Sequence, residues 1–171
     1  MTVRLGEPFD LGRAVSDVEA LLAAPVPGPG QTTVDRGDPV SGEWAGTDGD
    51  GFRIVPLWES ADFTGLYDPE WNQAAAVAQE HLAFLVHELD RKWGPHRTVG
   101  MRVAVFRRHR RGRPLPVLHQ TLTDRDLLGD LTVWDLAADR CLALSLSQSD
   151  GDAPMILAAV LSTRPVTEPP E

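Results

Sequence analysis

The stretch DPEWNQAAAVAQEHLAFLVHELDRKW, residues 68–93, decides the fold of this chain of 171 residues. Apolar side chains recur in it every three or four residues, the spacing that places them on one face of an α-helix. Asp68 suits the N-cap, Pro69 the first helical position, and Gly94-Pro95 the end of the helix. The pattern predicts a long amphipathic helix over 68–93, which needs a broad apolar surface to lie on. The residues of its stripe are Trp71, Ala74, Ala78, Leu82, Leu85 and Leu89, with Val77 and Phe84 widening it.

The sequence before this helix predicts a shorter helix and then a long connection. From Asp10 to Ala23 apolar residues recur at helical spacing, and Asp10 can cap the start. Over residues 24–51, 11 of 28 residues are Gly or Pro, and most of the others are polar or acidic. That composition predicts an irregular, acidic surface loop.

After the long helix the pattern changes to that of strands. We expect strands near residues 51–58, 99–105, 115–122, 131–136, 141–147 and 155–162. Short links such as Asp150-Gly151 favour antiparallel hairpins. The sequence therefore predicts an α+β fold, in which an antiparallel meander of five to six strands packs against the long helix.

The last expected strand raises the question of what covers the sheet. Residues 155–161 are apolar on both faces of the strand, so each side of the sheet there needs a cover. The long helix can cover one side. The N-terminal helix and its loop, or a second copy of the chain, can cover the other, and we therefore expect a homodimer.

Length and composition point to one domain over 1–171, with residues 164–171 expected to form a disordered tail. The single cysteine, Cys141, excludes a disulfide framework and a thiolate zinc site, and its small apolar neighbours predict a buried, inert thiol. No uncharged stretch approaches the roughly 20 residues of a membrane span, and the first residues lack the apolar segment of a secretory signal. We expect a cytoplasmic protein that does not cross a membrane.

The net charge of -9 hides a segregated pattern. Residues 91–113 hold nine of the 16 basic residues and no acid, whereas the segments on both sides are acidic. Because an acidic surface repels polyanions, nucleic acid is not the expected ligand. The leading hypothesis is a non-catalytic protein that acts through protein contacts, as an adaptor, a self-associating accessory protein or an immunity-like inhibitor of a toxin.

Two features are candidate contact sites. Trp44 is a large aromatic residue in the Gly-rich loop, where it can dock on a partner or on the protein's own groove. The second feature is a strip of five arginines, which can meet phosphate groups or an acidic partner, or can form a solvated hairpin tip between two strands. These arginines are Arg107, Arg108, Arg110, Arg111 and Arg113.

An alternative hypothesis starts from two H-x-T tripeptides, one at His96 to Thr98 and one at His119 to Thr121. On strands, they would place two imidazoles and two hydroxyls around one phosphate. The pattern is similar to that of the two-histidine phosphoesterases, although the resemblance covers these tripeptides only. It implies that the histidines act as base and acid while the threonines hold the phosphate oxygens. The alternative function is an enzyme or sensor for a small phosphorylated ligand or phosphodiester, with arginines of the 97–113 strip assisting.

Signals for other common chemistries are missing. The sequence contains no Gly-rich phosphate loop ending in Lys-Ser/Thr, no H-E-x-x-H, no G-x-S-x-G and no paired C-x-x-C. On the long helix, Glu80 shares a face with His87, and His81 with Glu88, but each pair lies two turns apart, too far to hold one metal ion. We expect no cofactor and no metal.

Overall fold

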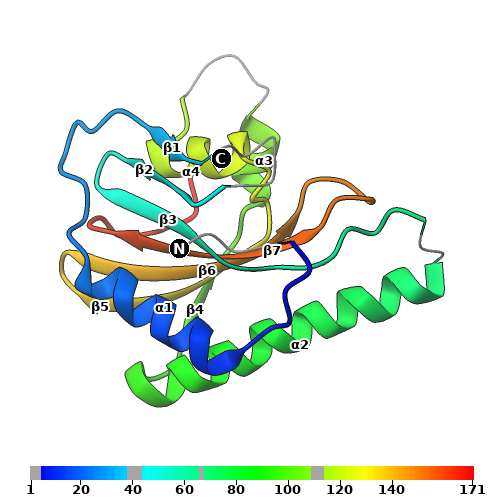
Figure 1. The fold of residues 1–171 in the computed structure, drawn as a ribbon. Helices are drawn as coiled ribbons and strands as arrows, with labels where there is room; N and C mark the ends of the chain where they lie inside the picture. Colours follow the sequence, from blue (N-terminus) through cyan, green and yellow to red (C-terminus); the bar gives the residue numbers. More distant parts are fainter. Residues whose placement is uncertain (1–4, 38–43, 66–67, 109–113) are drawn as a thin grey trace.

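The computed structural model describes residues 5–37, 44–65, 68–108 and 114–171. Within these residues the chain forms four helices and a seven-stranded sheet (Figure 1). The helices are α1 (Leu11–Ala23), α2 (Asp68–Trp93), α3 (Arg102–Arg107) and α4 (Val117–Asp124). The strands are β1 (Val34–Arg36), β2 (Gly46–Gly49), β3 (Phe52–Glu59), β4 (Arg97–Val99), β5 (Leu131–Ala137), β6 (Arg140–Gln148) and β7 (Met155–Ser162).

All neighbouring strands are antiparallel, in the order β1-β2-β3-β7-β6-β5-β4. Strands β4 to β7 pair in sequence order, as in a meander, and β7 then pairs with β3. The predicted α+β class and antiparallel sheet are confirmed. The prediction of a meander of five to six strands is wrong in detail, because the sheet has seven strands and β7 joins two groups of strands.

Both predicted helices form where the sequence places them. The Asp10 carboxylate accepts a hydrogen bond from the backbone N–H of Arg13 (2.9 Å), so Asp10 caps α1 as expected. Helix α2 runs over Asp68–Trp93. It ends where Gly94 adopts a positive φ of 87° and donates its N–H to the carbonyl of Asp90 (2.8 Å).

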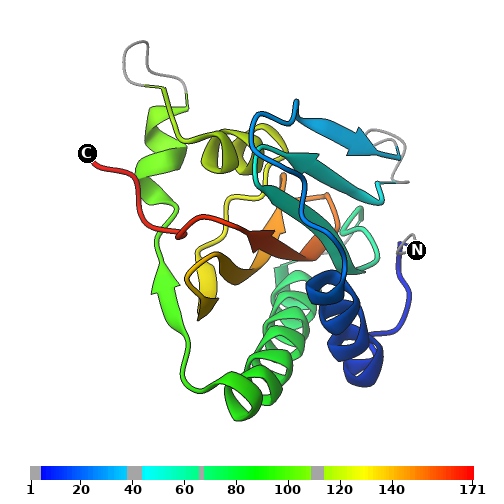
Figure 2. The same cartoon turned by 90° about the vertical axis from the view of Figure 1, so that its left-hand side faces the viewer.

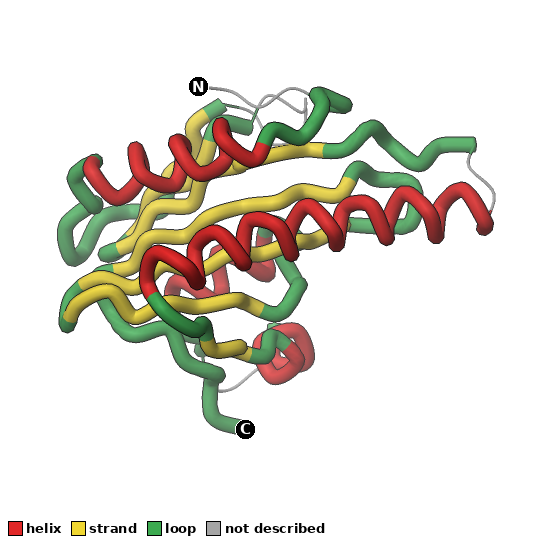
Figure 3. The backbone as a smooth tube through the Cα atoms, turned by 90° about the horizontal axis from the view of Figure 1, so that it is seen from below, coloured by secondary structure: helices red, strands yellow, loops and turns green. Residues whose placement is uncertain are grey.

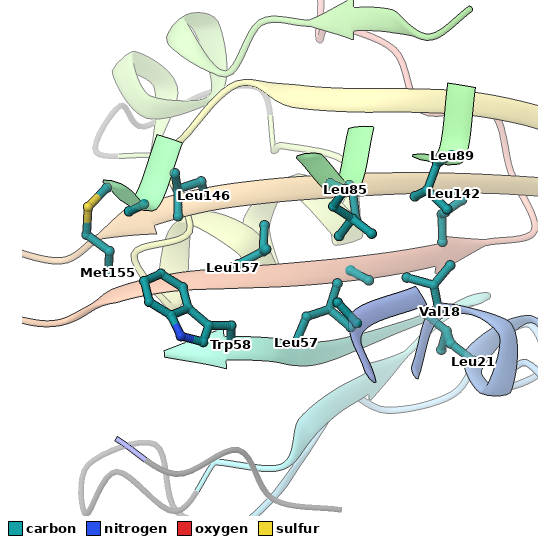
Figure 4. Close-up of a cluster of buried hydrophobic side chains, with 14 of the residues drawn as sticks. Val18, Leu21, Leu57, Trp58, Leu85, Leu89, Leu142, Leu146, Met155 and Leu157 are labelled. Carbon is teal, nitrogen blue, oxygen red and sulfur yellow. The ribbon is translucent and has the colours of Figure 1, made fainter. Parts of the chain in front are cut away.

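One face of the sheet, here called the first face, carries both α1 and α2. The two helices lie side by side across the strands (Figure 3), and they contact each other as well as the sheet. The buried cluster between the helices and the sheet is shown in Figure 4. It includes Val18 and Leu21 from α1, Leu85 and Leu89 from α2, and Leu57, Trp58, Leu142, Leu146 and Leu157 from the strands.

The opposite face, here called the second face, is covered by α3, α4 and the residues after β7 (Figure 2). Its buried cluster contains Ala104 of α3, Leu122 of α4 and Val166 near the C-terminus, together with Cys141 and Val160 of the sheet. The prediction that β7 is covered on both sides is confirmed. The expected source of the second cover is wrong, because α1 shares the first face with α2 and elements of the same chain cover the second face. The packing argument for a homodimer therefore no longer applies.

The strand expected over 99–105 is largely a helix. Strand β4 ends at Val99, and α3 follows at Arg102. The alternation of apolar residues here also contains the helical spacing of Met101 and Ala104, which are the buried residues. The carboxylate of Asp130 accepts the backbone N–H of Met101 (2.8 Å), which takes that N–H out of the strand ladder.

The strand expected over 115–122 is helix α4. The buried residues Leu115, His119 and Leu122 follow one another at steps of four and three residues. This is the spacing of side chains on one face of a helix. The hydroxyl of Thr121 donates to the carbonyl of Val117 (2.8 Å), a bond that a β-branched residue can make within a helix. The short apolar run fits both the two-residue period of a strand and the 3.6-residue period of a helix, and packing on the second face selects the helix.

Two expectations about irregular segments are also corrected. The expected loop over 24–51 contains strands β1 and β2. The expected disordered tail over 164–171 packs on the protein, where Val166 and Pro169 are buried.

Candidate functional site

His96 lies just after α2, at the edge of the first face. Its Nδ1 is 3.1 Å from both carboxylate oxygens of Asp90, and its ring packs at a steep angle against the ring of Trp134 (5.9 Å between ring centres). Burial raises the pKa of Asp90, but hydrogen bonds from His96 and Trp134 outweigh it and hold the pKa below its usual value. His96 therefore orders the end of α2 together with Asp90, which is a structural role. Thr98, on the edge strand β4, is exposed.

His119 lies on α4, within the second face, and only 4% of it is exposed. Burial lowers its pKa, and the backbone of Thr167 acts in the opposite direction. Thr121 is buried, and its hydroxyl donates a hydrogen bond to the carbonyl of Val117. The two H-x-T tripeptides thus lie on opposite faces of the sheet, so the structure does not bring them around one phosphate.

Trp44 packs on its own protein. Its ring is partly buried against the cluster of the second face, and its Nε1 donates to the hydroxyl of Thr47 (3.0 Å). That hydroxyl donates in turn to Asp35 (2.6 Å). Trp44 therefore docks on the protein's own surface in this structure, rather than projecting toward a partner.

The described arginines of the strip make contacts within the chain. Arg107 donates to the carbonyls of Pro170 (2.8 Å) and Pro114 (3.3 Å), and Arg108 pairs with Asp126 (3.5 Å). Arg110, Arg111 and Arg113 lie outside the described residues. Because the strip connects α3 to α4, it is not the tip of a hairpin between two strands.

A depression of about 450 Å³ lies between α3 and the C-terminal residues. It is lined by Arg102, Val103, Phe106, Arg107, Glu168 and Glu171. The two cations and two carboxylates balance, and the exposed ring of Phe106 lies under the guanidinium of Arg102 (5.5 Å to the ring centre). The charged side chains that line the depression therefore show no excess of either sign with which to select an ionic ligand.

Neither a metal site nor a membrane segment is found in the part of the chain that the structure describes. No three His, Cys, Asp or Glu side chains gather there in a way that could hold a metal ion. No helix there combines the length and the apolar character needed to cross a bilayer.

Comparison with known proteins gives no further lead. No protein-family model, no curated protein and no solved structure matches the chain. The candidate site therefore rests on the geometry and charge of this protein alone.

The outer side of α2 presents apolar residues to solvent. Phe84 is 56% exposed and Val77 is 41% exposed, although both were predicted to widen the buried stripe. Each precedes a buried residue, Leu85 or Ala78, by one position, which is a rotation of about 100° around the helix. Counting that rotation along the sequence would have placed both side chains off the buried stripe.

Carboxylates gather at one end of the molecule. The turn between β6 and β7, the loop after β3 and the start of α2 project together there (Figures 1 and 3). The indole N–H of Trp71 donates to the carbonyl of Gly151 (3.1 Å), and the N–H of Phe63 donates to the carbonyl of Asp152 (2.9 Å), which holds the three segments together. We call this region the acidic end and define it by Glu59, Asp62, Glu70, Asp150 and Asp152.

No basic residue belongs to the segments that build the acidic end. Residues 54–90 and 141–163 contain no Lys and no Arg. Burial raises the pKa of Glu59, and among the described residues no cation offsets this effect. The acidic end, together with the outer side of α2 from Val77 to Phe84, forms the candidate binding surface. The absence of basic residues over these segments is the signal in the sequence that could have located it.

Proposed function

We propose that this protein is non-catalytic and acts by binding a positively charged protein surface. The observation that supports this proposal is the pairing of two exposed apolar side chains on α2, Phe84 and Val77, with a neighbouring end built from described segments that carry carboxylates and no Lys or Arg. Protein interfaces commonly combine a few apolar anchors with a polar rim, and aromatic residues are frequent among the anchors.

Each part of this surface has a distinct physical role. Covering the exposed ring of Phe84 removes apolar area from water, which favours the complex. The carboxylates of the acidic end, with Glu80 on α2, attract a basic surface over about a Debye length and speed association. The same charges disfavour acidic partners, so they contribute specificity as well as rate.

Several biological roles fit such a surface, and they differ in the kind of protein that is bound. An adaptor, an accessory protein and an immunity-like inhibitor of a basic toxin would all use such a surface. We favour a different protein over a second copy, because pairing the same surface of two copies would bring two acidic ends together. We place this activity in the cytoplasm, where a reducing environment suits the unpaired Cys141.

The experiment isolates a partner and then alters the surface. The immobilised protein captures proteins from a lysate of the cells that produce it, and the affinity of each stoichiometric partner is measured at about 0.1 M and about 1 M salt. We expect a basic partner whose binding weakens by about tenfold or more at high salt. Phe84→Ala should weaken binding by about 30-fold, corresponding to about 2 kcal/mol for an interface anchor.

Phe106→Ala is the matched control, because Phe106 is an exposed ring on α3, away from the acidic end. It should leave the affinity unchanged. Glu80→Lys should weaken binding and reduce its dependence on salt. Three outcomes count against the proposal: equal losses from Phe84→Ala and Phe106→Ala, binding that does not depend on salt, or a chain that forms only homodimers at tens of micromolar in sedimentation.

A further inference from the structure

The residues after β7 cross the second face and end beside α3 (Figure 2). Arg164 pairs with Asp50 (3.0 Å), and the seven residues that follow form no strand pairing. We call residues 165–171 the C-terminal strap. Its main attachments are the buried side chains of Val166 and Pro169 and the hydrogen bond from Arg107 to the carbonyl of Pro170 (2.8 Å).

Two buried side chains lie against the backbone of this strap. The thiol of Cys141 meets the backbone of Val166, and the ring of His119 meets the backbone of Thr167. Within the described residues, neither ring nitrogen of His119 has a hydrogen-bond partner of acceptable distance and angle. A buried imidazole without well-formed hydrogen bonds is tolerated when neutral, but its charged form loses hydration that the backbone of Thr167 offsets only in part.

Within the part of the chain that the structure describes, the charged groups on the surrounding elements do not compensate a charge on His119. On α4, the Asp124 carboxylate accepts from Gln120, and the neighbouring Arg125 is held by Asp35. On the strap, the Glu168 carboxylate lies against Gly100. On α3, Arg107 is bound to the strap carbonyl of Pro170. Burial and the Thr167 backbone are the influences on the pKa of His119, and no charged side chain is among them.

We propose that the C-terminal strap is a pH-sensitive cover that leaves the second face when His119 becomes protonated. The strap is the element that yields because its attachments are few and it pairs with no strand of the sheet. Helix α4 is held more firmly, by buried Leu115 and Leu122 and by the two hydrogen bonds between Arg125 and Asp35. Release of the strap exposes His119 to water and uncovers Cys141.

The direction of the effect follows from burial. The pKa of His119 is lowered when the strap is closed and returns toward its usual value of about 6.5 when the strap is open. Closure is therefore fully favoured above about pH 6.5 and is lost as the pH falls from there through the lowered pKa. The opening equilibrium rises by at most tenfold per pH unit, and by at most about 30-fold between pH 7.5 and 5.0.

Cys141 reports opening directly, because it is the only cysteine and is 3% exposed. Its reaction with 4,4′-dithiodipyridine is followed from pH 7.5 to 5.0 and divided by the rate for the urea-unfolded chain at each pH. This ratio removes the intrinsic pH dependence of the thiol. We expect the protection of Cys141 to fall by up to about 30-fold toward pH 5.0. His119→Leu should remove this dependence, whereas His87→Gln, at an exposed histidine of α2, should retain it.

Two further measurements separate the strap from other sources of pH dependence. In hydrogen exchange, amides of residues 165–171 should lose protection toward pH 5.0 while those of β6 and β7 keep it. A chain ending at Arg164 should show low, pH-independent protection of Cys141, and it serves as a second variant if His119→Leu does not fold. The proposal is overturned if Cys141 protection is constant with pH, if His119→Leu keeps the wild-type profile, or if removal of the strap leaves Cys141 protected.

Discussion

The two faces of the sheet are packed by different means. On the first face, Leu142, Leu144 and Leu146 of β6 meet two helices of 13 and 26 residues. On the second face the same strand presents small side chains, and the covering helices have only six and eight residues. The small residues are Cys141, Ala143, Ser145 and Ser147, all of them buried.

Small side chains allow backbone to approach the sheet closely. A Cβ atom built on Gly129 would lie 2.2 Å from the carbonyl oxygen of Leu146, so only glycine fits there. The N–H of Gly129 donates to the hydroxyl of Ser147 (3.0 Å), which lies 2.8 Å from the hydroxyl of Ser145. The first face is therefore held by large apolar side chains, and the second also by close backbone contacts and buried polar groups.

The largest expected effect tests whether the two faces form one cooperative unit. Leu85→Ala on the first face and Leu122→Ala on the second should each lower the free energy of unfolding by about 2–5 kcal/mol, because both side chains are fully buried. Urea unfolding, followed by tryptophan fluorescence and by circular dichroism, measures both. The fluorescence reports mainly on the first face, because four of the five tryptophans, Trp58, Trp71, Trp93 and Trp134, belong to its cluster or pack against it.

Coincident fluorescence and circular dichroism transitions for both variants would support a single unit. A Leu122→Ala protein that loses helical signal before its fluorescence changes would show that the second face unfolds separately. Phe84→Ala is the control beside Leu85, and because its ring is exposed it should change stability by no more than about 0.5 kcal/mol.

A smaller effect tests the close approach on the second face. Gly129→Ala should lower the free energy of unfolding by about 1–3 kcal/mol, because the added methyl group forces backbone apart. Urea unfolding at pH 7 measures the change. Gly151→Ala is the control, since a Cβ atom there meets nothing within 4 Å and should alter stability by less than about 0.5 kcal/mol. Equal effects of the two substitutions would contradict the packing described for Gly129.

The smallest effect concerns the link between edge strand β1 and helix α4. Hydrogen bonding from Arg125 lowers the pKa of Asp35, so the stabilisation is present above about pH 3.8 and is lost as the pH falls through the lowered value. Asp35→Asn should cost about 0.5–1 kcal/mol at pH 7, because the pair is partly exposed to solvent. Denaturation at pH 7 and pH 3 compares the variant with the wild type. A cost that persists undiminished at pH 3 would show that charge is not the cause.

The sequence could predict the first face better than the second for a physical reason. A helix of 26 residues repeats its apolar period seven times, so the pattern in α2 excludes a strand. The apolar runs that form α3 and α4 are short enough to fit both the period of a strand and that of a helix. Packing against the small residues of the sheet selects the helix. The buried side of β6 could be anticipated from Leu142, Leu144 and Leu146, but the source of the second cover could not.

The candidate binding surface was less accessible to sequence reasoning. The acidic composition favours protein contacts, whereas the apolar pattern of α2 predicts a buried Phe84, although this residue lies one position of helical rotation away from the buried Leu85. Residues Gly151 and Trp71 are far apart in the chain, and only the fold brings their segments together. His96 and His119 looked like a pair in the sequence because a tripeptide carries no information about which face of the sheet it will occupy.

The position of β7 has a consequence for biosynthesis. This strand is the last in the chain, yet it lies at the centre of the sheet and pairs with both β3 and β6. A ribosome that has not yet released residues 155–162 therefore holds two groups of strands that lack the partner between them. The sheet can close only after β7 has emerged, so the strands made before it stay unpaired until then, and chaperones that shield unpaired strands are relevant to the yield of the protein.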